Sequence, residues 1–272
     1  MAWQVDFYRR PLIDEQGQPL WELLVCSDSL AYSAWCPQAQ ASADWLVAQL
    51  PQVAAQLPDR LQVFRPQSLG LLELAGQRLG IKVEATRRTP LLKAELQRRA
   101  ADYAGPSQAY DPLALEQPPP QALPESLWGD RWRFGSLAAG AIVPIFQDRP
   151  IPCLEIPAEL EPLNLGIASD LAVPGVIIDG GRHSLGLARW LQAANPAALN
   201  YIPTEVGRSG GLILAAGLVD RWILATFEDP EIARAAEVYE ERQQTARGLH
   251  FLLVRPDESG MTYSGFWLLQ AV

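Results

Sequence analysis

Apolar and polar positions in the first hundred residues change their period several times along the chain. Runs rich in aromatic and aliphatic residues, separated by turn residues, predict five strands, at residues 3–10, 20–27, 31–36, 61–65 and 81–85. Helical spacing of apolar residues predicts three helices, at residues 42–57, 68–79 and 89–103. Because the first three strands follow one another directly, we expect them to form an antiparallel meander. Each of the last two strands follows a helix, which predicts two crossover units.

The predicted helices carry residues typical of helix ends. Ser68 and Thr89 are predicted N-caps, Pro90 occupies the first position of its helix, and Gly80 ends the preceding one. Pro51 lies inside the first helical pattern, and we expect it to kink or split that helix. The element order β-β-β-α-β-α-β-α is that of ribonuclease H-like domains, which is the fold we predict for this half.

Residues 105–125 interrupt the pattern with proline-rich sequence. Gly105-Pro-Ser, Asp111-Pro and Gln117-Pro-Pro-Pro-Gln each break a regular element. We therefore predict an N-terminal domain over residues 1–104, an exposed linker over 105–125 and a C-terminal domain over 126–272.

The second half mixes strands with helices, which predicts an α+β domain and an α+β fold class for the whole chain. The clearest helix begins at Pro230 after Asp229 and ends at Arg247 before Gly248, and a second is expected over residues 184–194. Strands are predicted at residues 142–146, 153–156, 176–178, 200–206, 211–219, 221–227, 249–254 and 264–270. Three strands, a helix and more strand could repeat the first domain's order in a shortened form.

Composition indicates a compact globular protein. Hydrophobic residues make up 49% and charged residues 19% of the 272 residues, and no apolar run approaches the roughly 20 residues that span a bilayer. The start of the chain lacks the pattern of a secretory signal, and Cys26, Cys36 and Cys153 lack metal-ligand spacing. We expect a cytoplasmic protein with reduced cysteines and no cofactor.

The net charge of −9 argues against a protein that coats nucleic acid through its overall field, so RNA binding would need a local patch. Basic residues cluster near residue 90, where five of them accompany a single acid, Glu95; they are Arg87, Arg88, Lys93, Arg98 and Arg99. Arg9 and Arg10 close the first predicted strand. These seven residues are candidate RNA contacts, and the alternative is a solvated helix face.

Aromatic residues alternate with arginines directly after the predicted linker. Trp128, Trp132 and Phe134 are interleaved with Arg131 and Arg133. Single-stranded bases stack on exposed aromatic and guanidinium planes, which makes Trp132 and Arg133 candidate RNA contacts. Burial of the tryptophans in the core is the alternative.

A metal-dependent nuclease is a third possibility, because ribonuclease H-like enzymes need converging carboxylates. Asp6 on the first strand and Asp44 near the first helix are the candidates. The fourth strand ends in Arg65, where an acid would be needed, and an arginine there would repel the metal. We therefore predict no active site and no catalytic function.

The loop Gly180-Gly-Arg-His-Ser-Leu-Gly precedes a predicted helix but lacks the lysine of a P-loop, so a simple helix entry is the favoured interpretation. A hydrolase triad could be drawn with His183 and Ser184, although the sequence has no nucleophile elbow. His250 lies in an apolar strand, which predicts a core or edge residue.

Blocks near both ends of the chain resemble the Tab-two/Atab-two family of chloroplast and cyanobacterial proteins. The first blocks are Asp6-Phe-Tyr-Arg-Arg-Pro11 and Leu20-Trp-Glu-Leu-Leu24. The closing blocks are Trp222-Ile-Leu-Ala-Thr-Phe227, Gly248-Leu-His-Phe-Leu-Leu-Val254 and Gly265-Phe-Trp-Leu-Leu269, which contains the tripeptide Trp267-Leu-Leu269 of the family's C-terminal signature. That tripeptide is apolar, so we expect Trp267 to act in folding first.

The resemblance implies an RNA-binding factor that promotes translation of photosystem I reaction-centre mRNA and photosystem biogenesis. Its expected partner is single-stranded RNA in the mRNA 5′ leader, together with other translation or assembly proteins. Two alternatives stay open: an assembly factor that contacts nascent photosystem polypeptides, and the nuclease. An exposed apolar groove without a basic patch would favour the assembly factor.

Overall fold

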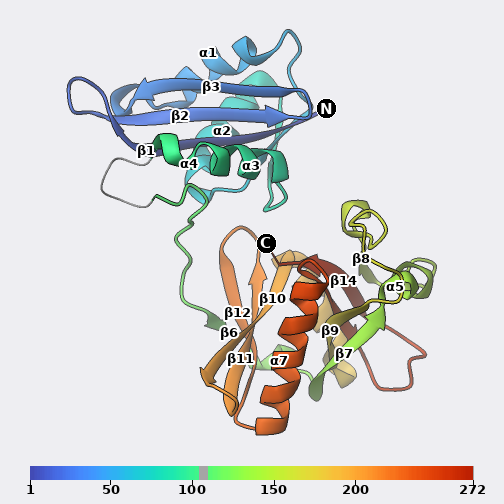
Figure 1. Cartoon of the computed structure of the whole chain (residues 1–272). Helices are drawn as coiled ribbons and strands as arrows, with labels where there is room; N and C mark the ends of the chain where they lie inside the picture. The colour runs from blue at the N-terminus through green and yellow to red at the C-terminus, as the bar shows by residue number, and fades with distance from the viewer. Residues whose placement is uncertain (104–109, 272) are drawn as a thin grey trace. The chain divides into compact units, whose positions relative to one another are not determined.

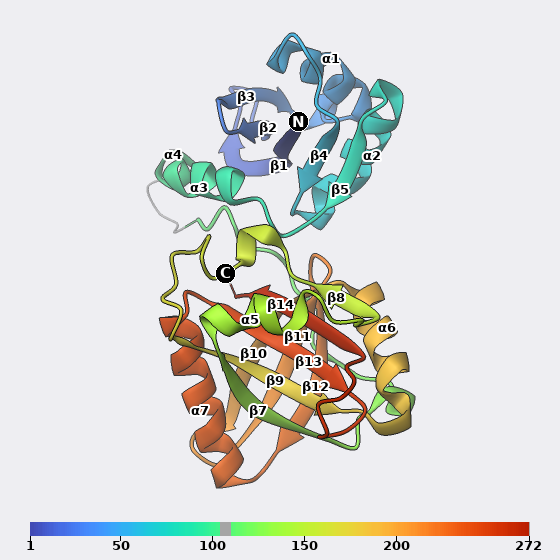
Figure 2. The same cartoon turned by 90° about the vertical axis from the view of Figure 1, so that its right-hand side faces the viewer.

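The computed structural model describes residues 1–103 and 110–271, which form two compact units, Met1–Glu116 and Gln117–Val272 (Figures 1 and 2). Within the described residues, none of the helices has the length and apolar character needed to cross a membrane.

The first unit contains one five-stranded sheet in the order β3-β2-β1-β4-β5. The first three strands are antiparallel neighbours, whereas β4 runs parallel to β1 and β5 parallel to β4. The strands are β1 (Ala2–Ile13), β2 (Pro19–Ser27), β3 (Leu30–Pro37), β4 (Arg60–Val63) and β5 (Lys82–Ala85). The expected meander and two crossover units are confirmed, and the ribonuclease H-like likeness that depends on them stays a prediction.

Helices cover both faces of this sheet. Side chains alternate between the two faces along each strand, and both faces carry buried apolar residues. The face that carries Val5 and Leu23 packs in one cluster with residues of α1 (Ala43–Val53) and α2 (Pro66–Leu79). The opposite face carries Leu24 and Cys26 and packs against α3 (Pro90–Arg98) and α4 (Ala100–Tyr103) (Figure 2). A 3-10 turn, Gln38–Gln40, precedes α1.

Several predicted helix ends differ from the structure. The second helix begins at Pro66, and Ser68 does not cap it; the Ser68 hydroxyl donates to the Phe7 carbonyl, 2.8 Å away. Thr89 precedes α3 as predicted, but its side chain makes no capping hydrogen bond. The helix expected up to Tyr103 divides into α3 and α4, while Pro51 lies within the last turn of α1.

The second unit contains two sheets, one in the order β7-β9-β13-β14-β8 and one in the order β10-β11-β12-β6. The strands of the five-stranded sheet are β7 (Arg131–Ala138), β8 (Cys153–Glu155), β9 (Ala172–Asp179), β13 (Leu249–Arg255) and β14 (Gly265–Gln270). Those of the four-stranded sheet are β6 (Gln121–Ala122), β10 (Pro196–Glu205), β11 (Ser209–Ala216) and β12 (Asp220–Phe227). Its helices are α5 (Ala139–Phe146), α6 (Ser184–Ala194) and α7 (Pro230–Thr245), with 3-10 turns at Glu125–Leu127, Ala158–Leu160 and Gly181–His183.

The main core of this unit lies between the two sheets and includes Val176, Leu214 and Trp267. A second core lies on the other face of the five-stranded sheet, where α5 packs against it (Figure 2). Trp267 is 1% exposed, as expected of a residue that acts in folding.

Two predictions for this half are wrong. The expected strand at residues 142–146 is the helix α5, whose Ala139, Ile142 and Phe146 form a buried face at helical spacing. The shortened repeat of the first domain is also wrong, because β13, the strand after α7, pairs with β9 and β14 and not with β10. A short apolar run fits a buried helix as well as a buried strand, and strand partners are not visible in local periodicity.

Candidate nucleic-acid interface

The proposed metal site at Asp6 is filled by arginine side chains. Asp6 is completely buried, and its carboxylate accepts hydrogen bonds from Arg65 Nε at 3.0 Å, Arg10 Nη2 at 3.1 Å and the Ser68 hydroxyl at 3.1 Å. Arg65 enters from the end of β4, as the sequence indicated, and replaces the cation that a nuclease would hold. Its guanidinium also donates to the carbonyls of Pro112 at 2.6 Å and Ala114 at 3.2 Å.

Asp44, the other proposed ligand, lies on the surface and forms an ion pair with Arg78. In the part of the chain that the structure describes, no three His, Cys, Asp or Glu side chains gather as metal ligands. The nuclease hypothesis therefore lacks its metal site, because the two carboxylates are each committed to arginines.

Glu22 on β2 is the second centre of this buried network. It accepts from Arg10 Nε at 2.8 Å, Arg99 Nη1 at 2.8 Å, the Ser33 hydroxyl at 2.8 Å and the Tyr103 hydroxyl at 2.6 Å. Burial, followed by the hydrogen bond to Glu22, raises the pKa of Tyr103 above its usual range. The carboxylate is thus surrounded by donors from β1, β3, α4 and the end of α3.

Two predicted RNA contacts belong to this network and not to the surface. Arg10 is 2% exposed and divides its hydrogen bonds between Asp6 and Glu22, so its guanidinium is buried in this network and does not lie at the surface. Arg99 has a side chain 19% exposed and bonds to both Glu22 and Glu95. A charged group is retained in a protein interior only when it is paired, which is why these arginines turn inward.

Arg98 is exposed but is paired with Glu95 through two hydrogen bonds, of 2.6 and 2.7 Å. These bonds, with those from Arg99, lower the pKa of Glu95 to about 2. Of the five basic residues near residue 90, Arg98 and Arg99 are therefore both paired with Glu95.

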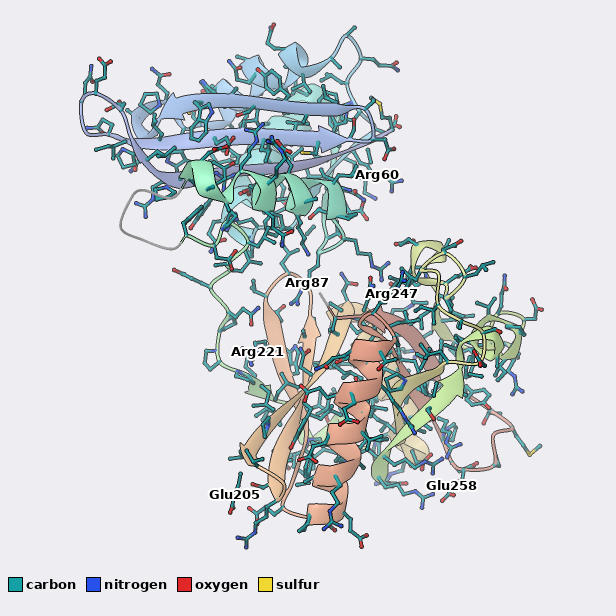
Figure 3. All side chains as sticks on the ribbon, in the orientation of Figure 1. Arg60, Arg87, Glu205, Arg221, Arg247 and Glu258 are labelled. Carbon is teal, nitrogen blue, oxygen red and sulfur yellow. The ribbon has the colours of Figure 1, made fainter. Side chains whose placement is uncertain are left out.

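The other three basic residues lie on the loop after β5 and in the first turn of α3 (Figure 3 labels Arg87). Arg87, Arg88 and Lys93 are each half-buried. Lys93 Nζ lies 5.9 Å from the centre of the Phe64 ring, and its pKa is lowered by burial and then by the positive charge of Arg87.

Arg9 is exposed, next to Arg10 on β1. Adjacent residues of a strand point to opposite faces of the sheet, so Arg9 does not share the face that carries Arg10 and α3. The structure thus joins three of the seven predicted basic residues, Arg87, Arg88 and Lys93, in one surface cluster, here called the basic cluster.

In the second unit, the basic and the aromatic residues of this segment lie on opposite faces of β7. Arg131 and Arg133 are exposed, whereas Trp132 and Phe134 turn toward the core and contact each other edge to face at 5.3 Å. Trp132 also lies 5.9 Å from Phe227. Trp132 is therefore a partly buried residue and not an open stacking platform.

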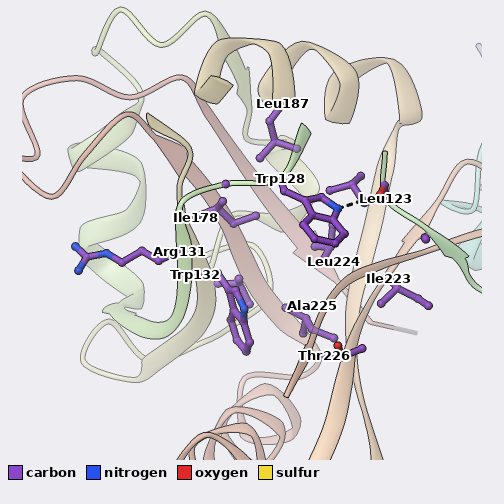
Figure 4. Close-up of a pocket in the computed structure, with 14 residues that line it drawn as sticks. Leu123, Trp128, Arg131, Trp132, Ile178, Leu187, Ile223, Leu224, Ala225 and Thr226 are labelled. Carbon is purple, nitrogen blue, oxygen red and sulfur yellow. Dashed lines mark hydrogen bonds between the residues drawn. The ribbon is translucent and has the colours of Figure 1, made fainter. Parts of the chain in front are cut away.

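A cavity of about 260 Å³ opens beside Trp132, between β7 and β9 on one side and β6 and β12 on the other (Figure 4). Its walls are mostly apolar and include Leu123, Trp132, Ile178, Leu187 and Leu224. Trp128, which is 57% exposed, also lines it, and its indole N–H donates to the Leu123 carbonyl at 3.0 Å. We call this space the tryptophan cavity.

The tryptophan cavity was not predicted from the sequence, although the pair Trp128 and Trp132 was noted. Both tryptophans belong to the same segment of alternating aromatic and basic residues, and no local pattern distinguishes Trp128 from Trp132. The arginine beside the cavity, Arg131, donates to Asp179 at 2.8 Å and pairs with Glu258, and its guanidinium points away from the cavity in Figure 4.

The loop that follows β9 and the two histidines make contacts within the second unit. The Ser184 hydroxyl accepts a hydrogen bond from the Ser264 hydroxyl at 2.9 Å, while His183 contacts Arg182. His250 is completely buried, as predicted, and its Nε2 accepts from the Leu199 N–H at 2.8 Å.

Comparison with known proteins covers both units. The profile described as RNA-binding protein Tab2/Atab2 N terminal matches residues 2–99, and the profile of the RNA-binding protein Tab2/Atab2 C-terminal domain matches residues 110–270. A chloroplastic TAB2 homolog from Arabidopsis thaliana is 28% identical over 282 residues, which cover 98% of this chain and 74% of the relative. Another chloroplastic TAB2 homolog, from Zea mays, is 30% identical over 285 residues, which cover 98% of this chain and 70% of that relative. Because both halves match the same family and the relatives align along almost the whole chain, this protein belongs to the RNA-binding Tab2/Atab2 family.

Proposed function

We propose that this protein binds single-stranded RNA in the 5′ leader of a photosystem I reaction-centre message and promotes its translation without itself catalysing a reaction. Family membership along both halves of the chain is the observation that carries the proposal. The two relatives are chloroplastic proteins, and we place this one in the corresponding cyanobacterial compartment, the cytoplasm.

The charge distribution supports the first unit as the place where RNA phosphates bind. Residues 1–116 carry 11 Lys and Arg against 13 Asp and Glu, whereas residues 117–272 carry 11 against 18. The first unit therefore repels a polyanion such as RNA much less than the second does. Within it, Arg87, Arg88 and Lys93 lie close together along the loop before α3 and the first turn of that helix, and this basic cluster is the proposed phosphate contact.

Neutralising the basic cluster tests this proposal. We compare Arg87→Ala/Arg88→Ala/Lys93→Ala with a matched control, Arg60→Ala/Arg78→Ala/Lys82→Ala, which removes the same charge from exposed positions of the same unit (Figure 3 labels Arg87 and Arg60). The control loses two surface ion pairs, of a kind that contributes about 0–1 kcal/mol each.

The readout is fluorescence anisotropy of a labelled single-stranded RNA at several salt concentrations. Each phosphate contact contributes about −0.7 to the slope of log K against log salt, so the cluster variant should have a slope shallower by roughly 2. A cluster variant that remains folded and keeps the wild-type affinity and slope would remove these residues from the interface. An equal loss in the control would point to overall charge.

The target and the rival function are separated in cells. RNA crosslinked to the protein should be enriched in photosystem I leader sequences relative to a control acidic protein. If RNA is recovered at the control's level and nascent photosystem polypeptides are recovered in its place, the assembly-factor alternative is favoured, and the tryptophan cavity is the apolar groove that this alternative requires.

A further inference from the structure

We infer that the tryptophan cavity of the second unit receives one unstacked RNA base. The inference rests on the proposed function and names the part of the RNA that this unit binds. It concerns a surface different from the basic cluster, and it can fail while RNA binding by the protein stands.

The charge of the second unit determines which part of an RNA can be bound there. With 11 basic against 18 acidic residues, residues 117–272 repel a phosphate chain. Arg131 does not alter this at the cavity, since it is paired with Asp179 and Glu258. A neutral, flat base avoids the repulsion, and single-stranded RNA is commonly recognised through bases that leave the stack and contact aromatic rings.

The walls of the cavity match such a ligand. Trp132, Ile178 and Leu224 offer apolar surface, and the exposed indole of Trp128 stands at the same cavity (Figure 4). The cavity volume of about 260 Å³ comes close to the lower end of small-molecule sites, roughly 300 Å³. Small side chains on the β6 and β12 side, Ala122 and Ala225, leave this space unfilled.

The indole of Trp128 is held in place before any ligand arrives. Its N–H is bonded to the Leu123 carbonyl at 3.0 Å, and the chain that follows is bound to β9 through the Asp130 N–H and the Asp179 carbonyl at 2.8 Å. Gly129, which lies between Trp128 and Asp130 in the chain, is so close to β9 that a Cβ atom at this position would stand 2.6 Å from Ile178 Cγ2. An exposed aromatic side chain that is already ordered loses little conformational entropy when it stacks on a ligand.

Two variants test the inference in different ways. Trp128→Ala removes the stacking surface, while Trp128→Phe keeps an aromatic ring and should restore much of the binding. Ala225→Phe fills the cavity without removing a core contact, which guards against a result caused by unfolding. The control is Trp35→Ala, which removes another exposed tryptophan, 39% exposed, from the first unit.

The probe is single-stranded RNA that carries 2-aminopurine at one position, with the position varied along the strand. In the wild-type protein, stacking should quench the fluorescence at one position, and Trp128→Ala and Ala225→Phe should abolish that quenching. Affinity should fall roughly 5- to 150-fold, which corresponds to the 1–3 kcal/mol of one stacked base at 1.4 kcal/mol per tenfold change. The salt slope should stay at its wild-type value, because a base and not a phosphate has been lost.

The outcomes distinguish the two proposals. If the wild-type protein binds no RNA, the proposed function fails. If it binds RNA with the slope expected of the basic cluster, but Trp128→Ala and Ala225→Phe bind and quench as the wild type does, the base site is refuted and the proposed function stands. If Ala225→Phe abolishes crosslinking to a nascent polypeptide and leaves RNA binding unchanged, the cavity is a protein-binding site and the base site is likewise refuted.

Discussion

Arg10 is expected to support the fold of the first unit and not the binding of RNA, and its replacement by methionine separates the two roles. Methionine keeps an unbranched side chain of similar reach but removes the guanidinium. Two hydrogen bonds are lost, from Nε to Glu22 at 2.8 Å and from Nη2 to Asp6 at 3.1 Å, between side chains that are all fully buried.

The size of the effect follows from what the two carboxylates keep. Breaking a buried ion pair costs about 3–5 kcal/mol when the remaining charge is left without a partner. Here Asp6 retains Arg65 and Ser68, and Glu22 retains Arg99 and Tyr103. We therefore expect the lower end of the range, a loss of about 3 kcal/mol in the free energy of unfolding of the first unit.

Hydrogen exchange of β1 and β2 peptides in increasing urea measures this loss within the first unit, which matters because the chain has two units. The matched control is Arg9→Met at the neighbouring exposed position, which should change stability by less than about 0.5 kcal/mol. A loss below about 1 kcal/mol in Arg10→Met would refute the structural role, as would weaker RNA binding with unchanged exchange.

Two further predictions concern the second unit. Trp267→Ala should lower the free energy of unfolding of this unit by about 3–5 kcal/mol, because the 1% exposed ring lies in the core between the sheets. Hydrogen exchange of β13 and β14 peptides measures the loss, and a loss below about 1 kcal/mol would show that the core repacks. Burial lowers the pKa of His250 from its usual 6.5 to about 4, so the unfolded chain takes up the proton first as pH falls. Stability should therefore be lost between pH 6.5 and 4, by up to about 3 kcal/mol, and level off below the folded pKa. His250→Gln should remove this component of the pH dependence, and an unchanged dependence of unfolding on pH would contradict the assignment.

The fold was predictable where the pattern is local. Strand periodicity and turn residues located β1 to β5 within a few residues, and α6 was predicted with its observed bounds, Ser184–Ala194. Prediction failed at α5, because a five-residue apolar run contains too few positions to separate a period of 3.6 from a buried strand. It failed again in the pairing of β13, since sheet partners are chosen by contacts between distant segments.

The candidate site was predictable in residue type but not in exposure. Arg65 was identified from the sequence as a residue that excludes a metal, and the structure places it against Asp6. For Arg10 and Arg98, in contrast, the sequence shows a positive charge but not the acids with which each side chain pairs.

By itself, the sequence determined the order of elements in the first unit, the family through blocks at both ends, and the need for a local RNA-binding surface in a chain of net charge −9. Only the tertiary structure decided which cations are buried in ion pairs and where a cavity remains between the sheets. The reason is distance along the chain: Glu22 meets Arg99 across 77 positions, and Asp6 meets Arg65 across 59. Periodicity acts over a few residues, whereas burial of a charge is settled by partners that folding brings together.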